Sequence, residues 1–409
     1  MPRKWGVLVA VSLMFFFITS ATFMSLGVVL FRMTRDLGWT QTEAGGSFSV
    51  LGLACCFSSL APMPLVDRIG AHWTMMLGAL VLALGFLAAF MTHGLPLFLV
   101  GTALMGVGFS LTANIPGVYL LARWFPARSG RIIGVYLMFG ALGGVAGPPL
   151  AQAVAASAGW RAWWLLLAIG AAAMGLLCLV LVRDRVAPPV DPENPAADGA
   201  GPAAWRYGAA IRTPQFAILA LAMVITETCV SVVHTSAVTH FSKLGLTAAF
   251  GALMLSAQAL MATAGKGISG TLGDWISPRL LLVGGLALES VGMILLGFAG
   301  APMLAYAFAV SFGIGWGTAY LAITVLLIDY FGPRTGSAVL SLVWLLTGFA
   351  ALGPTAAGMA ADRLGTFAPA FEVSGALLLP VALAALLMGR PVSRLEARGP
   401  RVVVARTGA

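Results

Sequence analysis

One lysine lies inside a long apolar stretch, where a positive charge is costly. Lys266 belongs to the apolar run 247–271 and precedes the next acid, Asp274, by eight residues. At 1.5 Å per helical residue it lies about 12 Å inside the polar end of that run, near the middle of a hydrocarbon layer about 30 Å thick. A charge at that depth costs at least about 2.5 kcal/mol unless it meets water or a counter-ion. Lys266 is therefore a candidate anion-binding residue; the alternative is that its stem carries the ammonium to the interface.

Two titratable residues share one face of the preceding run, 215–240. Glu227 and His234 are seven residues apart, which is two helical turns. Because histidine changes charge near neutral pH, the pair could relay a proton. The alternatives are an interhelical hydrogen bond and a histidine without a role in an outer vestibule. Glu289 lies within the run 280–299, where we expect a structural partner or a protonated carboxyl facing lipid.

The composition excludes a water-soluble globule. Of the 409 residues, 60% are hydrophobic and 9% are charged, and the mean hydropathy is +0.97, whereas soluble domains carry about 25% charge. A bilayer crossing needs about 20 apolar residues. The sequence therefore predicts an all-α integral membrane protein with twelve transmembrane helices, near 5–31, 45–65, 74–92, 96–122, 131–155, 162–182, 215–240, 247–271, 280–299, 302–327, 337–360 and 368–389.

The basic residues indicate which helix ends face the cytoplasm. The chain has 23 Lys and Arg against 14 Asp and Glu, a net charge of +9. With both termini inside, seventeen of the 23 fall in cytoplasmic segments and five in outer segments, as the positive-inside rule predicts. The preference for Arg over Lys is typical of a GC-rich bacterial genome. We therefore expect a multi-pass protein of the cell (inner) membrane with both termini cytoplasmic.

A polar stretch divides the chain. Residues 184–212 are rich in Pro, Gly, Ala and acids and predict a flexible or partly extended cytoplasmic linker. The predicted domains are an N-terminal six-helix half (1–183), this linker, a C-terminal six-helix half (213–390) and a cytoplasmic tail (391–409).

The two halves share landmarks at a nearly constant separation. The matched pairs are Asp67 and Asp274 at 207 residues, and Arg128 with Arg334 and Gly147 with Gly353 at 206. Two such halves, related by an axis along the membrane normal, are the arrangement of major facilitator transporters, whose sites lie near the midplane.

The motifs around these landmarks resemble the major facilitator superfamily. Its loop between helices two and three usually reads G-x-x-x-D-[RK]-x-G-x-[RK]; this chain keeps Asp67, Arg68 and Gly70 but has Met63 and His72 at the other two positions. Within the superfamily the chain is most similar to the monocarboxylate transporter and oxalate/formate antiporter branch. The segments that carry this likeness are Asp36-Leu37-Gly38-Trp39-Thr40 with Glu43, Trp124-Phe125 with Arg128 and Gly134, Gly159-Trp160-Arg161, and Arg212-Thr213-Pro214-Gln215-Phe216. The animal-type helix-one signature is absent, because Arg3-Lys4 precedes Trp5.

The resemblance implies roles for several residues. A cation on the eighth helix of the related transporters pairs with the substrate carboxylate, and Lys266 occupies that place. Ala262 stands where proton-coupled carriers have an acid, so proton coupling would need another group, or the protein would be an anion exchanger. Ser25 stands where some relatives have a lysine. Four further polar residues could hydrogen-bond a small acid or pack helices together, namely Asn114, Tyr119, Gln258 and Tyr320.

Charged loop residues are predicted to close the cytoplasmic side. In the superfamily such contacts break as the halves rock. The predicted gating residues here are Asp67, Arg68, Arg128, Asp274 and Arg334. The Gly-Pro pairs at 147–148 and 353–354 would let their helices bend or approach closely, or would be ordinary kinks.

We therefore expect a secondary active transporter of a small organic anion, a monocarboxylate or short dicarboxylate. It would work by alternating access as a proton symporter or an anion exchanger, and as a monomer. The alternative is a proton-driven exporter of amphipathic compounds, which Glu227 supports.

Other functional classes are not favoured. No nucleophile with its base and no metal-ligand spacing indicates an enzyme, and no nucleotide-binding loop indicates ATP-driven transport. The cysteines lie in apolar runs and imply neither a disulfide nor a metal: Cys55, Cys56, Cys178 and Cys229. We expect no cofactor and no nucleic-acid partner.

Overall fold

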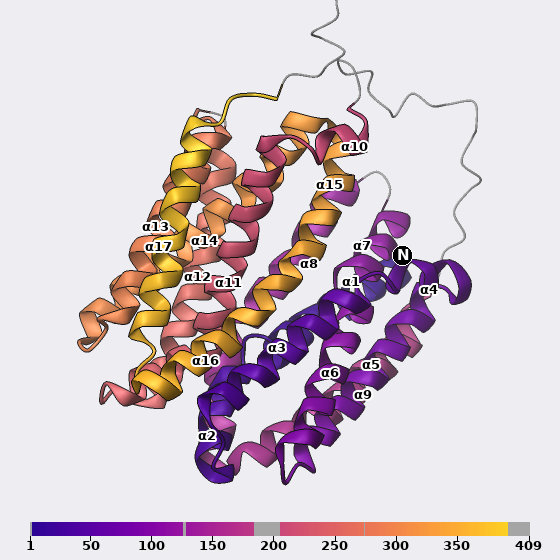
Figure 1. The fold of residues 1–409 in the computed structure, drawn as a ribbon. Coiled ribbons are helices and arrows are strands. Elements are labelled where there is room, and N and C mark those ends of the chain that lie inside the picture. Colours follow the sequence, from indigo (N-terminus) through magenta and orange to yellow (C-terminus); the bar gives the residue numbers. More distant parts are fainter. Residues whose placement is uncertain (1, 126–127, 184–204, 274, 392–409) are drawn as a thin grey trace, which may run out of the picture.

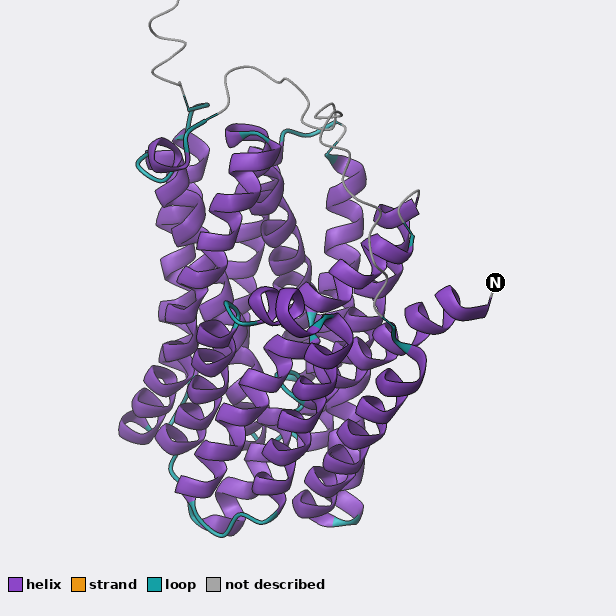
Figure 2. Ribbon diagram, turned by 90° about the vertical axis from the view of Figure 1, so that its right-hand side faces the viewer, coloured by secondary structure: helices purple, strands orange, loops and turns teal. Residues whose placement is uncertain are grey.

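The computed structural model describes residues 2–125, 128–183, 205–273 and 275–391, which contain helices joined by short loops and no strand (Figure 1, Figure 2). The N-terminal half contains α1 (Pro2–Ala21), α2 (Leu26–Leu37), α3 (Gln41–Ser58), α4 (Pro62–Ile69), α5 (Ala71–Phe90), α6 (Leu95–Thr112), α7 (Asn114–Trp124), α8 (Ser129–Ser157) and α9 (Gly159–Leu181). The C-terminal half contains α10 (Tyr207–Ala210), α11 (Pro214–Lys243), α12 (Ala248–Leu272), α13 (Pro278–Gly297), α14 (Pro302–Phe331), α15 (Pro333–Leu346), the 3₁₀ helix η2 (Thr347–Leu352), α16 (Gly353–Leu364) and α17 (Ala368–Leu387).

The helices account for the predicted membrane crossings. In the described part of the chain, eleven helical segments are long and apolar enough to span a membrane, and α3 with α4, bent by 50°, makes a twelfth when counted as one span. The prediction of an all-α membrane protein with twelve spans is confirmed. Most of the predicted linker and tail lie outside the described residues, and the described end of the linker contains the short helix α10.

The twelve spans give the bundle two ends. We call the end that holds residues 183 and 205 the linker end. The far end carries the turns that follow every odd-numbered span, including those at 38–40, 158, 244–247 and 365–367. In Figure 1 the linker end is at the top.

Two spans are interrupted within the membrane. The first breaks between α1 and α2, where the Ser25 hydroxyl donates to the carbonyl of Ser20. The eleventh narrows to η2 before Gly353-Pro354. Proline lacks the N–H that would continue the α-helical ladder, so the turn before Pro354 closes through the 3₁₀-type bond from Gly353 N–H to the carbonyl of Ala350.

The segments that carry the resemblance hold helix ends in place. Gly38 ends α2 in the left-handed region with φ of 69°, where glycine has no steric penalty. Thr40 and Glu43 then form a capping box that starts α3. Asp36 accepts a 2.9 Å hydrogen bond from the Trp160 indole, which joins two of these segments. They thus orient helices, and the ring contacts of Lys266 are with other residues, Trp316 and Tyr320.

The halves are joined by hydrogen bonds at the far end and along the adjacent helices. The Asp362 carboxylate of α16 accepts from the backbone N–H groups of Gln41 (2.9 Å) and Thr42 (2.8 Å) at the start of α3. It also accepts from the Thr42 hydroxyl at 2.5 Å. We call this set the far-end latch. Deeper in the bundle, Ser49 pairs with Thr355 at 2.7 Å.

Glycines let the backbones of the two halves touch. A Cβ added at Gly27 would lie 1.9 Å from the carbonyl oxygen of His234, and one at Gly45 would lie 2.2 Å from that of Pro354. These distances are far shorter than real Cβ contacts, so the halves can close at the far end only because both positions are glycine.

This contact predicts that Gly45→Ala opens the far end. Overpacking of this kind costs about 1–3 kcal/mol, and separating the halves relieves it. The rate at which an impermeant maleimide labels a cysteine placed at Ser49 is expected to rise. The matched control is Gly46→Ala, because a Cβ at Gly46 meets nothing within 4 Å. Equal labelling rates in the two variants would contradict the role given to Gly45.

Candidate substrate site

Six polar and aromatic side chains meet inside the C-terminal half. They come from three neighbouring helices, α11, α12 and α14, and we call them the central cluster: Glu227, His234, Gln258, Lys266, Trp316 and Tyr320. Five of them, all except Trp316, were predicted from the sequence as substrate-binding or proton-coupling residues.

The Lys266 ammonium lies against aromatic faces. Its nitrogen is 4.9 Å from the centre of the Trp316 ring and 4.5 Å from that of Tyr320. These distances are typical of cation–π contacts. Among the described residues Lys266 donates no hydrogen bond and forms no ion pair, although the side chain is half-buried. Its charge is therefore incompletely compensated.

The direction of the Lys266 side chain follows from the direction of α12. This helix starts at the far end, and helical side chains lean toward the helix N-terminus. Lys266 is six residues before the last residue of α12, about 9 Å along the axis. Its side chain extends from there toward Trp316, which is fifteen residues from the end of α14. The ammonium thus points toward the membrane interior and away from the linker end.

Trp316 connects the lysine to an acid. Its indole N–H donates to the Glu227 carboxylate at 3.3 Å, while its ring faces the ammonium of Lys266. Glu227 and Lys266 act on each other electrostatically, but within the described part of the chain they form no direct ion pair. Because the Trp316 ring separates the Glu227 carboxylate from the Lys266 ammonium, the ammonium is open to a second anion.

His234 and Gln258 form the other end of the cluster. Their side chains hydrogen-bond at 3.2 Å, and the His234 ring stands edge-on to Trp316 with 6.2 Å between centres. Gln258 has 0% of its surface exposed, and its amide nitrogen has no partner among the described residues. The predicted pair of Glu227 and His234 therefore lies on one face, bridged by Trp316 rather than in direct contact.

Glu289 lies outside this cluster. It is fully buried in α13, and one carboxylate oxygen accepts from the Thr226 hydroxyl of α11 at 3.1 Å. The alternative of a carboxyl facing lipid is wrong, because the neighbouring helices enclose the side chain completely. The Glu289 carboxylate thus joins α13 to α11 through its hydrogen bond with Thr226.

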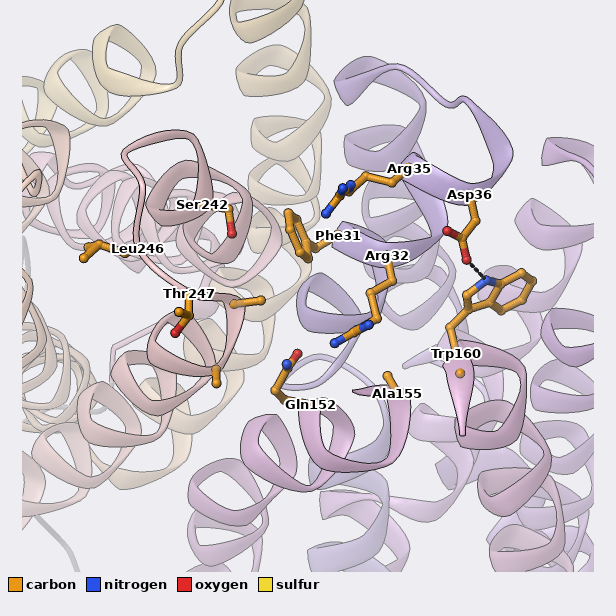
Figure 3. A pocket seen from close by; sticks show the side chains of 13 residues that line it. Phe31, Arg32, Arg35, Asp36, Gln152, Ala155, Trp160, Ser242, Leu246 and Thr247 are labelled. Atoms are coloured by element: carbon orange, nitrogen blue, oxygen red, sulfur yellow. Dashed lines mark hydrogen bonds between the residues drawn. The ribbon is translucent and has the colours of Figure 1, made fainter. Parts of the chain in front are cut away.

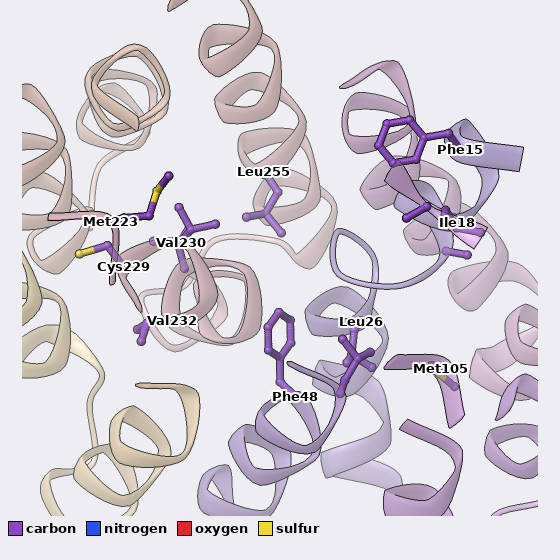
Figure 4. Close-up of a cluster of buried hydrophobic side chains, with 14 of the residues drawn as sticks. Phe15, Ile18, Leu26, Phe48, Met105, Met223, Cys229, Val230, Val232 and Leu255 are labelled. Carbon is purple, nitrogen blue, oxygen red and sulfur yellow. The ribbon is translucent and has the colours of Figure 1, made fainter. Parts of the chain in front are cut away.

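Apolar side chains from both halves meet beside the central cluster. Figure 4 shows Leu26 and Phe48 of the N-terminal half facing Val230 and Leu255 of the C-terminal half. All four are at most 6% exposed. These side chains pack the two halves against each other beside the cluster.

Other predicted site residues lie apart from the central cluster. Ser25 is fully buried and is engaged with Ser20 in the break of the first span. Tyr119 lies under the guanidinium of Arg123, 4.3 Å from its ring centre. Asn114 begins α7, and its side chain is outside the described atoms.

The predicted gating residues that the structure describes lie at the linker end. Asp67 and Arg68 are exposed at the end of α4, and in the described residues neither forms an ion pair; Arg128 is also exposed. Asp274 lies outside the described residues, as does the side chain of Arg334. Their gating role stays a prediction.

Sequence reasoning missed Trp316, which contacts three other members of the central cluster. The available signal was its position four residues before Tyr320, since residues at i and i+4 share a helix face. Trp344 was also missed, and its ring lies 5.6 Å from that of Tyr320. No group of three metal-ligating side chains occurs in the part of the chain that the structure describes.

Comparisons with known proteins agree with this architecture. Residues 11–351 match the sequence profile of the Major Facilitator Superfamily. Monocarboxylate transporter 11 of Homo sapiens is 31% identical over 374 residues, which cover 85% of this chain and 74% of that protein. A probable L-galactonate transporter of Escherichia coli (strain K12) is 28% identical over 162 residues, which cover 39% of this chain and 36% of that protein.

Solved structures show the same fold at low sequence identity. The crystal structure of a bacterial homolog of the human lysosomal transporter Spinster, inward-facing and occupied, superimposes with a TM-score of 0.74 at 14% identity and covers 95% of each chain. With its twelve apolar spans in two six-helix halves and a family match over most of its length, the chain belongs to the major facilitator superfamily and is a transporter that resembles the monocarboxylate transporter branch.

Proposed function

We propose that the protein carries a small organic anion, a monocarboxylate or short dicarboxylate, across the cell membrane by alternating access of its two halves. The observation that carries this proposal is the Lys266 ammonium, which is half-buried, points into the membrane interior and has no ion-pair partner among the described residues. A carboxylate would compensate this charge through a charge-assisted hydrogen bond.

The aromatic residues of the cluster suit an anion with a short carbon chain. Trp316 and Tyr320 flank the ammonium, and Trp344 extends the aromatic surface beyond Tyr320. A carboxylate on Lys266 would place its carbon chain against these rings, where apolar contact is favourable. Two of the relatives in the sequence comparison, a monocarboxylate transporter and a probable galactonate transporter, are named for carboxylates.

The contacts between the halves support an inward-facing conformation. The far-end latch and the apolar packing close one end, and the excess of Lys and Arg assigns the linker end to the cytoplasm by the positive-inside rule. The central cluster would then exchange its anion with the cytoplasm, and rocking of the halves would open it to the exterior.

The test is counterflow of labelled C1 to C6 carboxylates in proteoliposomes, with and without an inward proton gradient. Saturable exchange of one or more acids is expected. Gradient-driven accumulation would assign proton symport, and exchange indifferent to the gradient would assign an anion exchanger. If no carboxylate moves while amphipathic cations are extruded in response to the gradient, the protein is an exporter and the proposal is wrong.

Glu227 is the proposed proton-coupling residue in a symporter. Its carboxylate is bound to Trp316, whose ring covers Lys266, so protonation of Glu227 would change the charge felt by the substrate. For Glu227→Gln, we expect loss of gradient-driven accumulation with counterflow retained. Glu289→Gln is the matched control, because the Glu289 carboxylate accepts from Thr226 and, among the described residues, forms no hydrogen bond with Trp316 and no ion pair with Lys266. Accumulation that survives Glu227→Gln would assign the proton to another group.

A further inference from the structure

A second polar site lies at the far end of the molecule, between the two halves. It is an open pocket of about 670 Å³. Arg32, Arg35 and Gln152 line it from the N-terminal half, and the C-terminal half contributes Thr247 and the first turn of α12. Figure 3 shows Arg32 and Gln152 at the centre of the pocket, opposite Thr247.

The arginines of this pocket form no ion pair within the described part of the chain. Among the described residues Arg32 forms no ion pair and no hydrogen bond, and its Nε is buried without a partner. Arg35 packs over Phe31 at 5.7 Å from the ring centre. The one acid of the lining, Asp36, accepts a hydrogen bond from Trp160. The pocket therefore has a positive excess charge and an unused guanidinium donor.

Two further groups in the pocket favour an anion. The side-chain oxygen of Gln152 is buried without a partner in the described part of the chain, and rotation of the amide would present its N–H₂ instead. Ala248 and Ala249 belong to the first turn of α12, whose backbone N–H groups have no partner within the helix. The Thr247 hydroxyl accepts a hydrogen bond from the backbone N–H of Phe250 and not from those of Ala248 and Ala249. A helix N-terminus adds positive potential at the same point.

We propose that this pocket binds a small oxyanion, a carboxylate or a phosphate, through Arg32, Gln152 and the N-terminus of α12. It is distinct from the central cluster, because the first residue of α12 is ten residues from Gln258, about 15 Å along the helix, and eighteen residues from Lys266, about 27 Å. The pocket volume accommodates an acid of a few carbons.

Because the pocket lies between the two halves, a bound anion would affect how readily the halves separate. Its two walls belong to different halves, which meet at this end through the far-end latch. An anion that contacts both walls binds more tightly when the walls are close, so it stabilises the conformer closed at the far end. External anion would therefore slow the opening to the exterior.

The test measures access to the pocket in a chain whose central cation has been removed. Ala249 is replaced by cysteine in a Lys266→Ala background, and the protein is placed in phosphatidylcholine nanodiscs. An impermeant, negatively charged thiol reagent is then applied with oxalate, inorganic phosphate or neutral oxamide. Oxalate and phosphate are expected to slow modification of the cysteine by about tenfold, and oxamide is expected to have no effect.

Arg32→Gln is expected to abolish this protection. Arg32→Lys should retain part of it, because the charge stays while the planar fork is lost. Arg363→Gln is the matched control, since Arg363 is an exposed arginine at the same end that does not line the pocket. Absence of protection by either anion, or equal protection in Arg32→Gln and Arg363→Gln, would overturn the proposal.

A second preparation identifies the source of the oxyanion. In nanodiscs that contain phosphatidylglycerol, a bound lipid phosphate would slow modification before any anion is added more strongly in the chain that keeps Arg32 than in Arg32→Gln, whereas repulsion of the reagent by the anionic surface would slow both equally. Because the central cation is absent throughout, the outcome is independent of whether Lys266 binds the transported substrate.

Discussion

Lys266→Ala is expected to reduce carboxylate counterflow in proteoliposomes by about 10- to 100-fold at limiting substrate concentration. A hydrogen bond to a charged group contributes about 1.5–3 kcal/mol, and about 1.4 kcal/mol corresponds to a factor of ten in affinity. Lys266 is the one cation of the central cluster, so its loss leaves the substrate carboxylate facing Glu227 alone. The defect should appear mainly as an increased KM.

Two variants at the same position separate charge from shape. Lys266→Arg keeps the positive charge and the contact with the Trp316 and Tyr320 rings, so we expect partial transport. Lys266→Gln keeps a polar, slightly shorter side chain without the charge and should resemble alanine. Normal transport in Lys266→Gln would show that the ammonium is not the substrate ligand.

The matched control is Lys243→Gln. Lys243 is also a lysine near an aromatic ring, 5.4 Å from the centre of Phe367, but it lies at the far end and donates to the carbonyl of Gly365 at 3.0 Å. Its replacement removes a cation without changing the central cluster. Counterflow in Lys243→Gln should therefore stay within about twofold of the native rate, a change typical of surface substitutions.

Asp362→Ala is expected to shift the carrier toward the conformer open at the far end. The Asp362 carboxylate accepts three hydrogen bonds from Gln41 and Thr42 across the two halves. It also lies at the N-terminus of α3, where a negative charge is favourable. Because the Asp362 carboxylate is exposed, its three hydrogen bonds together stabilise the closed conformer by only about 1–2 kcal/mol. Their loss therefore changes the ratio of the two conformers by about 5- to 30-fold.

Distances between spin labels at the far end would measure this shift. Met91 and Met303 are exposed there in different halves, and each can be replaced by a labelled cysteine after the native cysteines are removed. In Asp362→Ala the population at long distance should grow, and Asp362→Asn should lie between the native protein and alanine. An unchanged distance distribution would mean that the glycine contacts alone hold the far end closed.

An acid at the opposite end provides the matched control for Asp362. Asp329 pairs with Arg390 at 3.0 Å at the linker end, where both side chains are largely exposed. Asp329→Ala removes an exposed acid that does not bridge the halves. The distances at the far end should therefore stay unchanged in this variant.

The two substitutions address different steps of transport. Lys266 belongs to the site that would hold the substrate, whereas Asp362 belongs to the contact that closes one end of the bundle. A loss of affinity in the first variant and a change of conformer ratio in the second would together support alternating access.

The sequence alone determined the membrane fold. The apolar runs specified twelve crossings, because a bilayer accepts only segments whose backbone hydrogen bonds are satisfied internally and whose side chains are apolar. Composition is sufficient for this inference, since each helix meets this requirement of the bilayer independently of its neighbours. The depth of Lys266 could be estimated for the same reason, by counting residues along one helix.

The tertiary structure decided which polar residues meet. Trp316 and Lys266 are fifty residues apart on different helices, so no spacing in the sequence predicts that the indole links the ammonium to Glu227. The pairing of Asp362 with α3 and the convergence of Arg32 with the N-terminus of α12 likewise depend on how the halves pack. Such packing depends on the shapes of whole helix faces, as at Gly27 and Gly45, where missing side chains allow the backbones to touch.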